Sequence, residues 1–351
     1  MEEAAFFLLR VSCATYNHSA YIIDAMNGFV MQQTSFPFVC TIVDDASTDG
    51  QQDVIRTFVI ENFDEQDTSI AYDKDTEYGH VTFARHKSNK NCYFAVVYLK
   101  ENHYSQKKSK ASYLQKWNNV KYMAICEGDD YWTDPLKLQK QVDYMEEHED
   151  CCMCCHAVNW ETDGELYKEG CRYEKQCDLT TEEVICNNGL YIATCSLLYR
   201  VELNQDRPEW RKAAHVGDTP LVILGTLRGK LHFFPDAMGV YRYRSQGSWT
   251  AYHFEMAKLD KTGVNLDYAR NNVLWFGLLD RDTAYKYSGV IHTRLFQYYS
   301  LLFRAKEIAL PDFVLAAKKA DQKRHLRFFK DLMIRYLSPL YGVYLHLIGK
   351  K

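Results

Sequence analysis

The sequence lacks the features that mark several common protein classes. It has no apolar run long enough to cross a bilayer, so no transmembrane helix is expected. Its first residues, Met1-Glu2-Glu3, are acidic, and the apolar stretch at 6–9 is too short for a secretory signal. Walker and Gly-x-Gly-x-x-Gly sequences are also absent, which argues against P-loop and dinucleotide-binding proteins.

Charge of one sign is not in excess either. The formal net charge is −4, from 42 Lys and Arg against 46 Asp and Glu, which argues against a nucleic-acid binder. With 351 residues the chain can form one large domain or two modest ones. In the absence of a signal sequence we expect a cytoplasmic protein whose thiols are reduced.

The 12 cysteines show no regular metal-binding spacing apart from one cluster, Cys151-Cys152-Met153-Cys154-Cys155. Four thiols within five residues could suggest zinc. However, alternate residues of a strand point to opposite faces, so the four could not surround one ion without bending the chain. A free cysteine also behaves as a small buried hydrophobe. We therefore expect a core strand here and no structural zinc.

Apolar runs and helical patterns alternate along the first half of the chain. Strands are expected at 6–14, 38–43 and 122–126, with a short one at 69–72, and helices after each polar turn, over 21–29, 51–59 and 136–145. This alternation predicts an α/β fold with a parallel sheet and right-handed crossovers. The basic, aromatic stretch 87–119 is open to two interpretations, a solvated surface insertion or a mobile loop over a diphosphate.

The most informative stretch is Cys126-Glu127-Gly128-Asp129-Asp130-Tyr131-Trp132, which follows an apolar strand. Acidic residues at the carboxyl end of a parallel strand lie where open α/β sheets bind ligands. Adjacent carboxylates favour a hard cation such as Mg²⁺ or Mn²⁺, which often shares its ligands with substrate phosphates. The alternative is that these aspartates only cap the next helix. Asp134, followed by Pro135, is better placed to cap it, so we favour a metal site.

Two further polar turns follow strands, at Thr15-Tyr16-Asn17 and at Asp44-Asp45. In an open α/β sheet such turns converge on one crevice. Asp44 or Asp45 would then accept hydrogen bonds from a nucleobase or ribose, while the metal would hold the phosphates.

The second half of the chain continues with strands at 151–160, 191–199, 231–234 and 239–243, and a helix that begins near Asp218. From about residue 251 the sequence is helical. We expect a catalytic domain over 1–250, with a nucleotide-binding half at 1–132 and an acceptor half at 133–250, and a helical region over 251–351. Residues 318–351 hold nine Lys or Arg and two Asp among apolar residues. Such a helix can lie on an anionic membrane surface or pack on the domain, and the pattern alone does not decide.

Taken in order, these motifs resemble family 2 glycosyltransferases over residues 7–250. Ser12 to Asn17 is similar to the family's opening V-S-x-x-x-Y-N, and 44–50 to its D-D-x-S-x-D-G. The stretch 127–132 resembles its Asp-x-Asp equivalent. Gly217-Asp218 resembles its catalytic carboxylate, and the stretch from Tyr241-Arg242 through Trp249 resembles its closing segment.

The resemblance implies a GT-A fold with a mixed, mostly parallel sheet and an inverting transfer from a nucleotide-sugar, most simply a UDP-sugar. Thr15, Tyr16 and Asn17 would contact the nucleotide. Asp44 would hold the base with support from Asp45. Asp129 would contact the ribose or the metal, and Asp130 would ligate Mg²⁺ or Mn²⁺. Asp218 would be the general base, although an Asp ahead of Pro220 can also be a helix cap.

Other assignments rest on partial matches. Arg85 lies in a stretch, 78–86, that partly matches the family's N-x-G-x-x-x-A-R-N loop and would bind the nucleotide or diphosphate. The family's His two residues after Arg is replaced by Arg244, so His253 is a candidate third metal contact. Trp132, His156 and Trp249 would face the acceptor.

The expected product is a surface polysaccharide of bacterial type, built on a lipid-linked carbohydrate acceptor at the inner face of the membrane. Two alternatives remain at this stage. A sugar-phosphate nucleotidylyltransferase would be expected to carry a Gly-rich, basic N-terminal loop that this chain lacks. An inactive sugar- or lipid-binding module would not need to retain Asp44, Asp129, Asp130 and Asp218 together.

Overall fold

The computed structural model describes residues 7–110, 112–168, 173–186, 192–246, 248, 250–251, 255, 263–320 and 325–336. Contacts divide the chain into two units. The first comprises Met1–Leu179, Tyr191–Gln205 and Gly225–Tyr252, and the second Thr180–Leu190, Asp206–Leu224 and His253–Lys351. The second unit thus gathers 206–224 with the C-terminal helices, and the domain division expected at residue 250 stays a prediction.

The first unit contains every described strand and the first three α-helices. Its strands are β1 (Leu9–Thr15), β2 (Phe38–Asp44), β3 (Phe63–Asp64), β4 (Tyr72–Asp75), β5 (Gly79–His86), β6 (Cys92–Leu99), β7 (Tyr122–Ile125), β8 (Tyr131–Trp132), β9 (Cys151–Thr162), β10 (Glu165–Lys168), β11 (Cys177–Leu179), β12 (Leu198–Arg200) and β13 (Lys230–Arg242). Its α-helices are α1 (Ile22–Val30), α2 (Gln51–Asn62) and α3 (Lys137–Glu147), with 3₁₀ turns at Gln115–Trp117, Thr194–Ser196 and Val201–Asn204.

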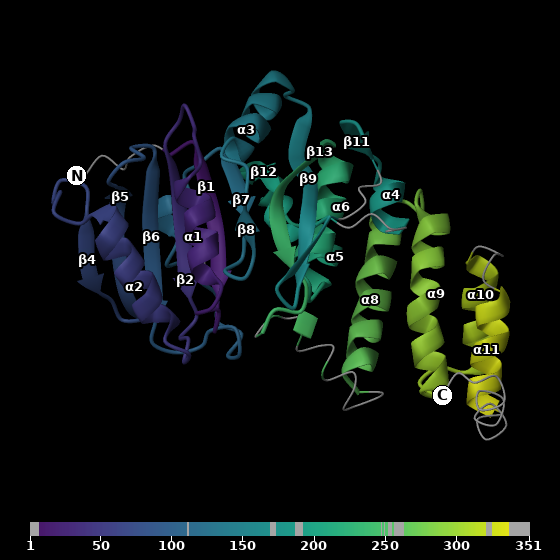
Figure 1. Ribbon diagram of the computed structural model, residues 1–351. Helices are drawn as coiled ribbons and strands as arrows, with labels where there is room; N and C mark the ends of the chain where they lie inside the picture. The colour runs from purple at the N-terminus through teal and green to yellow at the C-terminus, as the bar shows by residue number, and fades with distance from the viewer. Residues whose placement is uncertain are drawn as a thin grey trace. The chain divides into compact units, whose positions relative to one another are not determined.

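These strands form one mixed sheet whose central strands are parallel, in the order β11-β13-β9-β12-β7-β1-β2-β6-β5-β3 (Figure 1). Strands β7, β1, β2 and β6 run parallel to one another, as do β9 and β13. Strand β12 runs antiparallel between β7 and β9, and β5 runs antiparallel to β6. Parallel neighbours bring their carboxyl ends to one edge, which is where the polar turns expected from the sequence lie.

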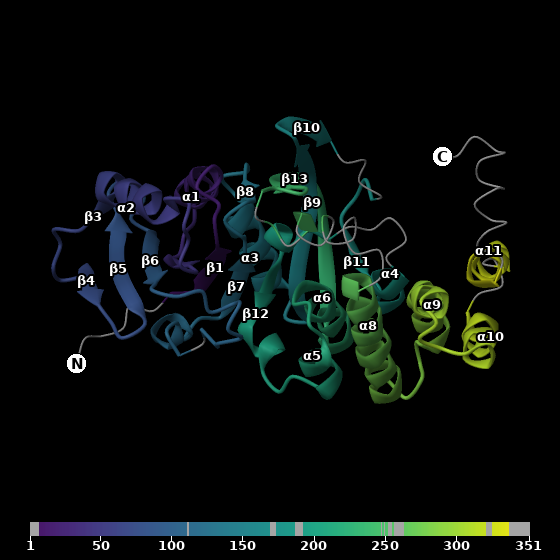
Figure 2. The ribbon, with the colours of Figure 1, turned by 90° about the horizontal axis from the view of Figure 1, so that it is seen from below.

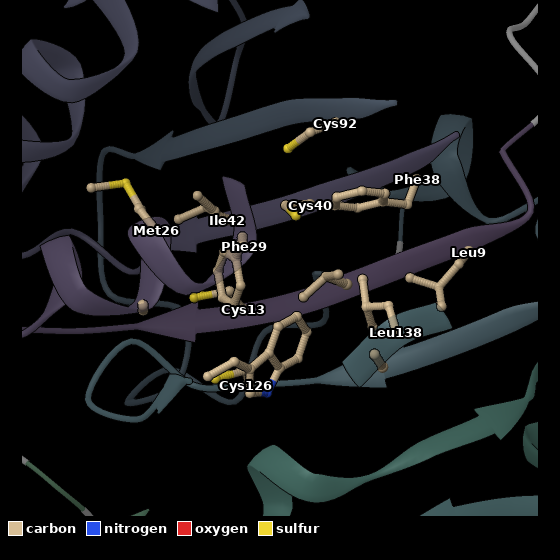
Figure 3. Packing of buried hydrophobic residues seen from close by; sticks show 14 of the residues in the cluster. Leu9, Cys13, Met26, Phe29, Phe38, Cys40, Ile42, Cys92, Cys126 and Leu138 are labelled. Carbon is tan, nitrogen blue, oxygen red and sulfur yellow. The ribbon is translucent and has the colours of Figure 1, made fainter. Parts of the chain in front are cut away.

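Successive apolar side chains of the central strands point to opposite faces of the sheet, and both faces are buried. Cys40 and Ile42 of β2 point into the large core that α1, α2 and α3 also form, while Val39 and Val43 point into a smaller one built around Trp117. Figure 2 shows α1 and α2 on the same side of the sheet, and Figure 3 shows the side chains packed between α1 and the central strands. Burial on both faces explains why these strands read as nearly continuous apolar runs.

Two local expectations are corrected. Residues 92–99 lie in the stretch read as an irregular insertion but form the buried strand β6, because Cys-Tyr-Phe-Ala-Val-Val-Tyr-Leu packs on both faces of the sheet. Helix α3 begins at Lys137, and its N-cap position is Leu136, with no side-chain cap. Asp134 lies before the cap and accepts a hydrogen bond from Leu136 N at 2.8 Å, so it supports the turn rather than capping the helix.

The cysteine cluster is a core strand, as expected, but it contains a β-bulge. Lys230 of β13 pairs with Cys151, and the next residue, Leu231, pairs with Met153, so Cys152 is the extra residue. The bulge brings the sulfur atoms of Cys151 and Cys154 to 3.8 Å from each other. The expected absence of zinc stays a prediction.

The second unit is helical in its described part. It contains α4 (Thr181–Cys186), α5 (Glu209–Ala213), most of α6 (Asp218–Arg228), α8 (Gly263–Asp282), α9 (Ser288–Arg304), α10 (Leu310–Lys319) and α11 (His325–Tyr336). Phe303 and Phe313 stack at 4.2 Å between ring centroids, and Phe313 stacks on Phe328 at 5.1 Å, which joins α9, α10 and α11. None of the helices in the described part is both long and apolar enough to span a bilayer.

Candidate functional site

Three polar turns from separate parts of the first unit meet at the carboxyl edge of β1, β2 and β7. Asp45 N donates to Thr15 O at 3.0 Å, and Gly128 N donates to Ala14 O at 3.1 Å. A Cβ added to Gly128 would lie only 2.2 Å from Thr15 Oγ1 and 2.6 Å from Thr15 Cβ. Glycine is therefore required at residue 128 for the acidic turn to approach the Thr15 turn this closely.

The first turn is fixed to the second by side-chain hydrogen bonds. Asn17 adopts a left-handed conformation with φ of 56°, which asparagine tolerates well. Its Oδ1 accepts from Thr48 N at 2.8 Å, and its backbone N donates to Ser47 Oγ at 2.9 Å. Tyr16 beside it is 37% exposed, so its ring is available to a ligand.

Asp44 is fully buried and supports the turn from within. Its Oδ1 accepts from Ser47 N at 2.9 Å and from Gln52 Nε2 at 2.7 Å, and its Oδ2 accepts from Gln51 Nε2. Gln51 is the first residue of α2 and is also fully buried. The predicted contact between Asp44 and the base stays a prediction, and any such contact would have to share these oxygens.

Asp45 anchors the basic stretch that the sequence left open. Its carboxylate accepts from His103 N at 2.8 Å and Tyr104 N at 3.0 Å, and Lys110 Nζ lies 2.8 Å from Oδ2. Farther along, Trp117 is buried in the smaller core. These anchors attach the loop to the end of β2, beside the site, while the side chain of Tyr104 remains 73% exposed.

The two aspartates of the acidic turn differ in their surroundings. Asp130 is 2% exposed, and its Oδ1 accepts from Arg242 N at 2.9 Å, which joins the turn to β13. Burial, together with the neighbouring Asp129 charge, raises the pKa of the Asp130 carboxyl well above its usual value. Asp129 is 7% exposed, and its Oδ2 accepts from Ser245 Oγ at 2.6 Å.

Arg242 holds this turn in place. Its Nη1 donates to Asp129 O at 3.0 Å and its Nε to Glu161 at 2.9 Å, and its Nη2 pairs with Asp24 of α1. The guanidinium carbon lies 5.0 Å from the ring centroid of Tyr21 and 4.5 Å from that of Tyr131. A buried arginine with two carboxylate partners and two aromatic faces is a rigid support.

The residues present fit a divalent ion that takes part of its coordination from substrate. No group of three or more His, Cys, Asp or Glu within the described ranges is arranged to hold a metal by itself. Mg²⁺, however, is commonly held by one or two carboxylates together with substrate phosphates. Asp129 supplies one carboxylate, and close by, within the described part of the chain, the buried Nε2 of His18 has no hydrogen-bond partner.

Arg85 does not reach the site. It lies on β5, where it pairs with Tyr93 of β6, and Tyr93 pairs with Val39 of β2. Val39 precedes Asp44 by five residues, which is about 16 Å along a strand. Because β5 runs antiparallel to β6, its carboxyl end lies at the opposite edge of the sheet, and the partial motif match at 78–86 was misleading.

Of the three residues expected to face the acceptor, the two that the structure describes are buried. Trp132 is 2% exposed, packs against Phe29 at 5.0 Å between ring centroids, and donates from Nε1 to Cys195 O at 2.8 Å. His156 is also 2% exposed. In this arrangement neither ring offers a surface to a sugar. Trp249 and His253 lie outside the described residues.

Asp218 lies in the second unit, in the first turn of α6. Its Oδ1 accepts from Thr219 N at 2.6 Å, and its side chain is partly exposed. The contact with Thr219 orients the carboxylate at the start of α6. The role of general base stays a prediction.

Sequence reasoning missed several residues that build the site. Three sets of contacts join a motif residue to a distant part of the chain: Gln51 with Thr15, Ser245 with Asp129, and Asp24 and Glu161 with Arg242. Only His18 had a signal, since it directly follows Thr15-Tyr16-Asn17 and its ring lies against the same turn.

Known proteins share both sequence and fold with this chain. Uncharacterized proteins of Mycobacterium bovis and Mycobacterium tuberculosis are each 28% identical to it over 261 residues, which are 72% of this chain and 64% of the relative. The chain thus spans less than two thirds of the length of these relatives. A crystal structure of S. aureus TarS 1-349 in complex with UDP-GlcNAc matches 88% of this chain and 79% of that one, with 14% identity and a TM-score of 0.52, which shows a shared fold.

The family model described as Glycosyl transferase family 2 matches residues 11–207, more than half of the chain. The match includes the Thr15, Asp44 and Asp129 turns that the structure brings together. The fold is that of GT-A glycosyltransferases, as expected from the sequence. The chain belongs to glycosyl transferase family 2.

Proposed function

We propose that this protein transfers a sugar from a nucleoside-diphosphate donor to an acceptor hydroxyl, with inversion at the anomeric carbon. The meeting of the Thr15, Asp44 and Asp129 turns at one sheet edge, within a family 2 match, carries this proposal. The TarS structure was solved with UDP-GlcNAc, which makes a UDP-sugar the first donor to test.

In this proposal Asp129, rather than Asp130, faces the divalent ion. Asp130 has its Oδ1 bound to Arg242 N and is almost fully enclosed, whereas the partner of Asp129 Oδ2 is a hydroxyl that can rotate away. Mg²⁺ or Mn²⁺, when bound, would offset the charge that develops on the leaving nucleoside diphosphate. Asp130 would keep the turn attached to β13. Tyr16 and Asn17 would line the nucleotide-binding site.

Asp218 is the proposed general base, which would take the proton from the acceptor hydroxyl. We expect Asp218→Asn to lower turnover by about 10²–10⁴-fold, since an amide cannot accept that proton. Binding of UDP should be unchanged, and calorimetric titration beside steady-state kinetics measures both. If turnover is retained, Asp218 is only the cap of α6.

The proposed acceptor is a lipid-linked carbohydrate of a surface polysaccharide, which would place the protein at the inner face of the membrane. Helix α11 supports this part. Phe329 and Tyr336 expose 60% and 55% of their surface, Met333 exposes 38%, and the spacing puts all three on one helical face. The neighbouring Lys330 is exposed and would meet anionic headgroups.

Vesicle binding tests this surface. Phe329→Glu together with Met333→Glu should abolish cosedimentation with vesicles that contain anionic lipid, because buried apolar area is replaced by repelled charge. The matched control is Ile60→Glu on α2, a residue that is 55% exposed, and it should bind vesicles normally. Equal binding by both variants would exclude this face of α11 as the contact.

The proposed reaction itself is tested by supplying UDP- and GDP-sugars with Mn²⁺, Mg²⁺ or EDTA and following sugar release and transfer. We expect metal-dependent turnover of one donor and, by NMR, a product whose anomeric configuration is opposite to that of the donor. Release of pyrophosphate from a nucleoside triphosphate and a sugar phosphate would instead identify a nucleotidylyltransferase.

A further inference from the structure

His18 has a buried nitrogen that the fold leaves without a partner. The residue is 7% exposed, and no described residue forms a hydrogen bond with its Nε2. A buried polar atom without a partner costs free energy, so its presence needs an explanation. His18 directly follows the Thr15-Tyr16-Asn17 turn and is held from both its backbone and its ring.

The hydrogen bonds that hold His18 begin at Asp44. Gln51 Nε2 donates to Asp44 Oδ2, so the amide oxygen of Gln51 points the other way. That oxygen accepts from His18 N at 2.6 Å, which independently fixes the orientation of the amide. It also accepts from Thr15 Oγ1 at 2.9 Å. The direction of donation is therefore set at each step of this series.

The same series fixes the proton on the His18 ring. Thr15 Oγ1 has one hydrogen, and that hydrogen is donated to Gln51 Oε1. Toward His18 Nδ1, at 3.3 Å, the hydroxyl can therefore only accept, so Nδ1 must carry a proton. Burial lowers the pKa of His18 below its ordinary value, against the opposing charges of Asp129, Asp49 and Asp44. The neutral ring then has a free lone pair at Nε2.

We propose that His18 Nε2 is a donor-binding atom, which uses this lone pair to accept a hydrogen bond from a nucleoside hydroxyl of the nucleotide-sugar or to coordinate the divalent ion bound with its diphosphate. The inference rests on the proposed function for its ligand. Two observations carry it, the partnerless buried Nε2 and the series of hydrogen bonds that presents it. An imidazole whose other nitrogen is fixed by a hydrogen bond is the form in which histidine serves as a ligand.

The position of His18 agrees with that role. Asp129, Asp49 and Asp44 each raise its pKa and Arg242 lowers it, so the ring lies near charged groups of the other two turns and of β13. Its ring meets that of Tyr21 edge-on at 6.3 Å between centroids, and Tyr21 also contacts Arg242. Gln51 is a positioning residue in this account, because it acts through Thr15 and His18.

Two substitutions separate the nitrogens. His18→Asn places an amide near Nδ1 and keeps the contact with Thr15 but has nothing at Nε2. His18→Gln reaches the position of Nε2. Calorimetric titration with UDP, and with GDP if UDP does not bind, is done in Mn²⁺ and in EDTA, and the melting temperature is recorded for each variant.

We expect His18→Asn to weaken nucleotide binding at least about tenfold, or 1.4 kcal/mol, at an unchanged melting temperature, and His18→Gln to weaken it less. A loss in both Mn²⁺ and EDTA identifies a hydroxyl ligand, and a loss in Mn²⁺ alone identifies the ion. Wild-type affinity in His18→Asn would overturn the inference. If the wild-type protein binds neither nucleotide, the proposed function fails instead.

Nitrogen-15 NMR of the wild-type protein covers the case in which the variants do not fold. Before nucleotide is added, the His18 ring should show a protonated Nδ1 and an unprotonated Nε2. Addition of nucleotide and Mg²⁺, which is diamagnetic, should shift the Nε2 resonance more than that of Nδ1. A protonated Nε2 in the free protein, or an Nε2 resonance that does not move, would contradict the proposal.

Discussion

Two buried polar regions of the first unit flank the acidic turn, and they are built in opposite ways. On one side, Asp44, Gln51, Thr15 and His18 form a continuous series of hydrogen bonds that ends in a single partnerless atom. On the other side, Lys137 is fully buried with no hydrogen bond from Nζ, and the Nε2 of His156 also lacks one. Lys137 Nζ instead lies 3.9 Å from the ring centroid of Trp132.

The two regions therefore differ in role. The network that ends at His18 is arranged for binding, whereas the buried Lys137 lowers the stability of the fold. In the first region every hydrogen bond has a fixed direction, and the last atom, His18 Nε2, remains available to a ligand. A buried ammonium among the thiols of Cys126, Cys154 and Cys195 has no such direction, and burial lowers the pKa of Lys137 to about 7. We therefore expect changes on the first side to alter ligand binding and changes on the second to alter stability.

The largest effect is expected from Asp129→Asn. Loss of the carboxylate that we propose faces the ion should reduce metal-dependent turnover by about 10²–10⁴-fold, because charge stabilisation in the transition state is lost. The concentration of Mn²⁺ required for half-maximal activity should rise as well, and kinetics at several Mn²⁺ concentrations show both. The companion Asp130→Ala variant should instead lower the melting temperature, since it removes the oxygen that accepts from Arg242 N of β13. A wild-type response to Mn²⁺ in Asp129→Asn would move the ion elsewhere.

Lys137→Met should raise the stability of the protein. Unfolded lysine titrates near pH 10.4, whereas Lys137 in the folded protein titrates at about 7 because of burial. Between these values the unfolded state binds more protons, so the wild-type free energy of unfolding should rise with pH. Methionine removes that slope and should add about 1–4 kcal/mol at pH 7, as measured by denaturant unfolding at several pH values. A destabilised variant with the slope intact would refute this account of Lys137.

Gly128 lies in the acidic turn between the two regions, and Gly128→Ala is expected to have the smallest effect of the three substitutions. The added Cβ would meet Thr15 Cβ at 2.6 Å, and a β-branched side chain cannot swing away easily. We expect a cost of about 1–3 kcal/mol, shared between the melting temperature and nucleotide affinity. Gly277→Ala on α8, where an added Cβ meets nothing within 4 Å, is the control for the added methyl group, and it should leave nucleotide affinity unchanged.

The sequence predicted the parallel core because its signals are local. The runs at 38–43 and 122–126 and the amphipathic helices at 22–30 and 51–62 each carry their own period, and the structure has them within a few residues. Strand β6 was missed because basic and aromatic residues around 87–119 hid an apolar run, and β5 because 78–86 was interpreted as a partial match to a loop motif. Arg85 was assigned to the site from that motif match, whereas the direction of β5 is set by its pairing with β6 and not by its own residues.

The parts of the site that lie at strand ends could be predicted from the sequence. The parts that depend on contacts between distant segments could not. Parallel strands gather Thr15, Asp44 and Asp129 by geometry alone. The partners Gln51, Ser245 and Arg242 come from a helix start and from the end of β13, and no spacing in the sequence links Ser245 to Asp129, which lies 116 residues earlier. Trp132 looked like an acceptor platform because burial cannot be read from residue type.

The central claim, that the three turns form one nucleotide-sugar site, is tested most directly by a crystal structure of the full chain with UDP and Mn²⁺. The account predicts the ion and the diphosphate at Asp129, the nucleoside along Tyr16 and Asn17, and a ligand oxygen or the ion within bonding distance of His18 Nε2. A nucleotide bound elsewhere, with these turns unchanged and solvent at His18, would contradict it.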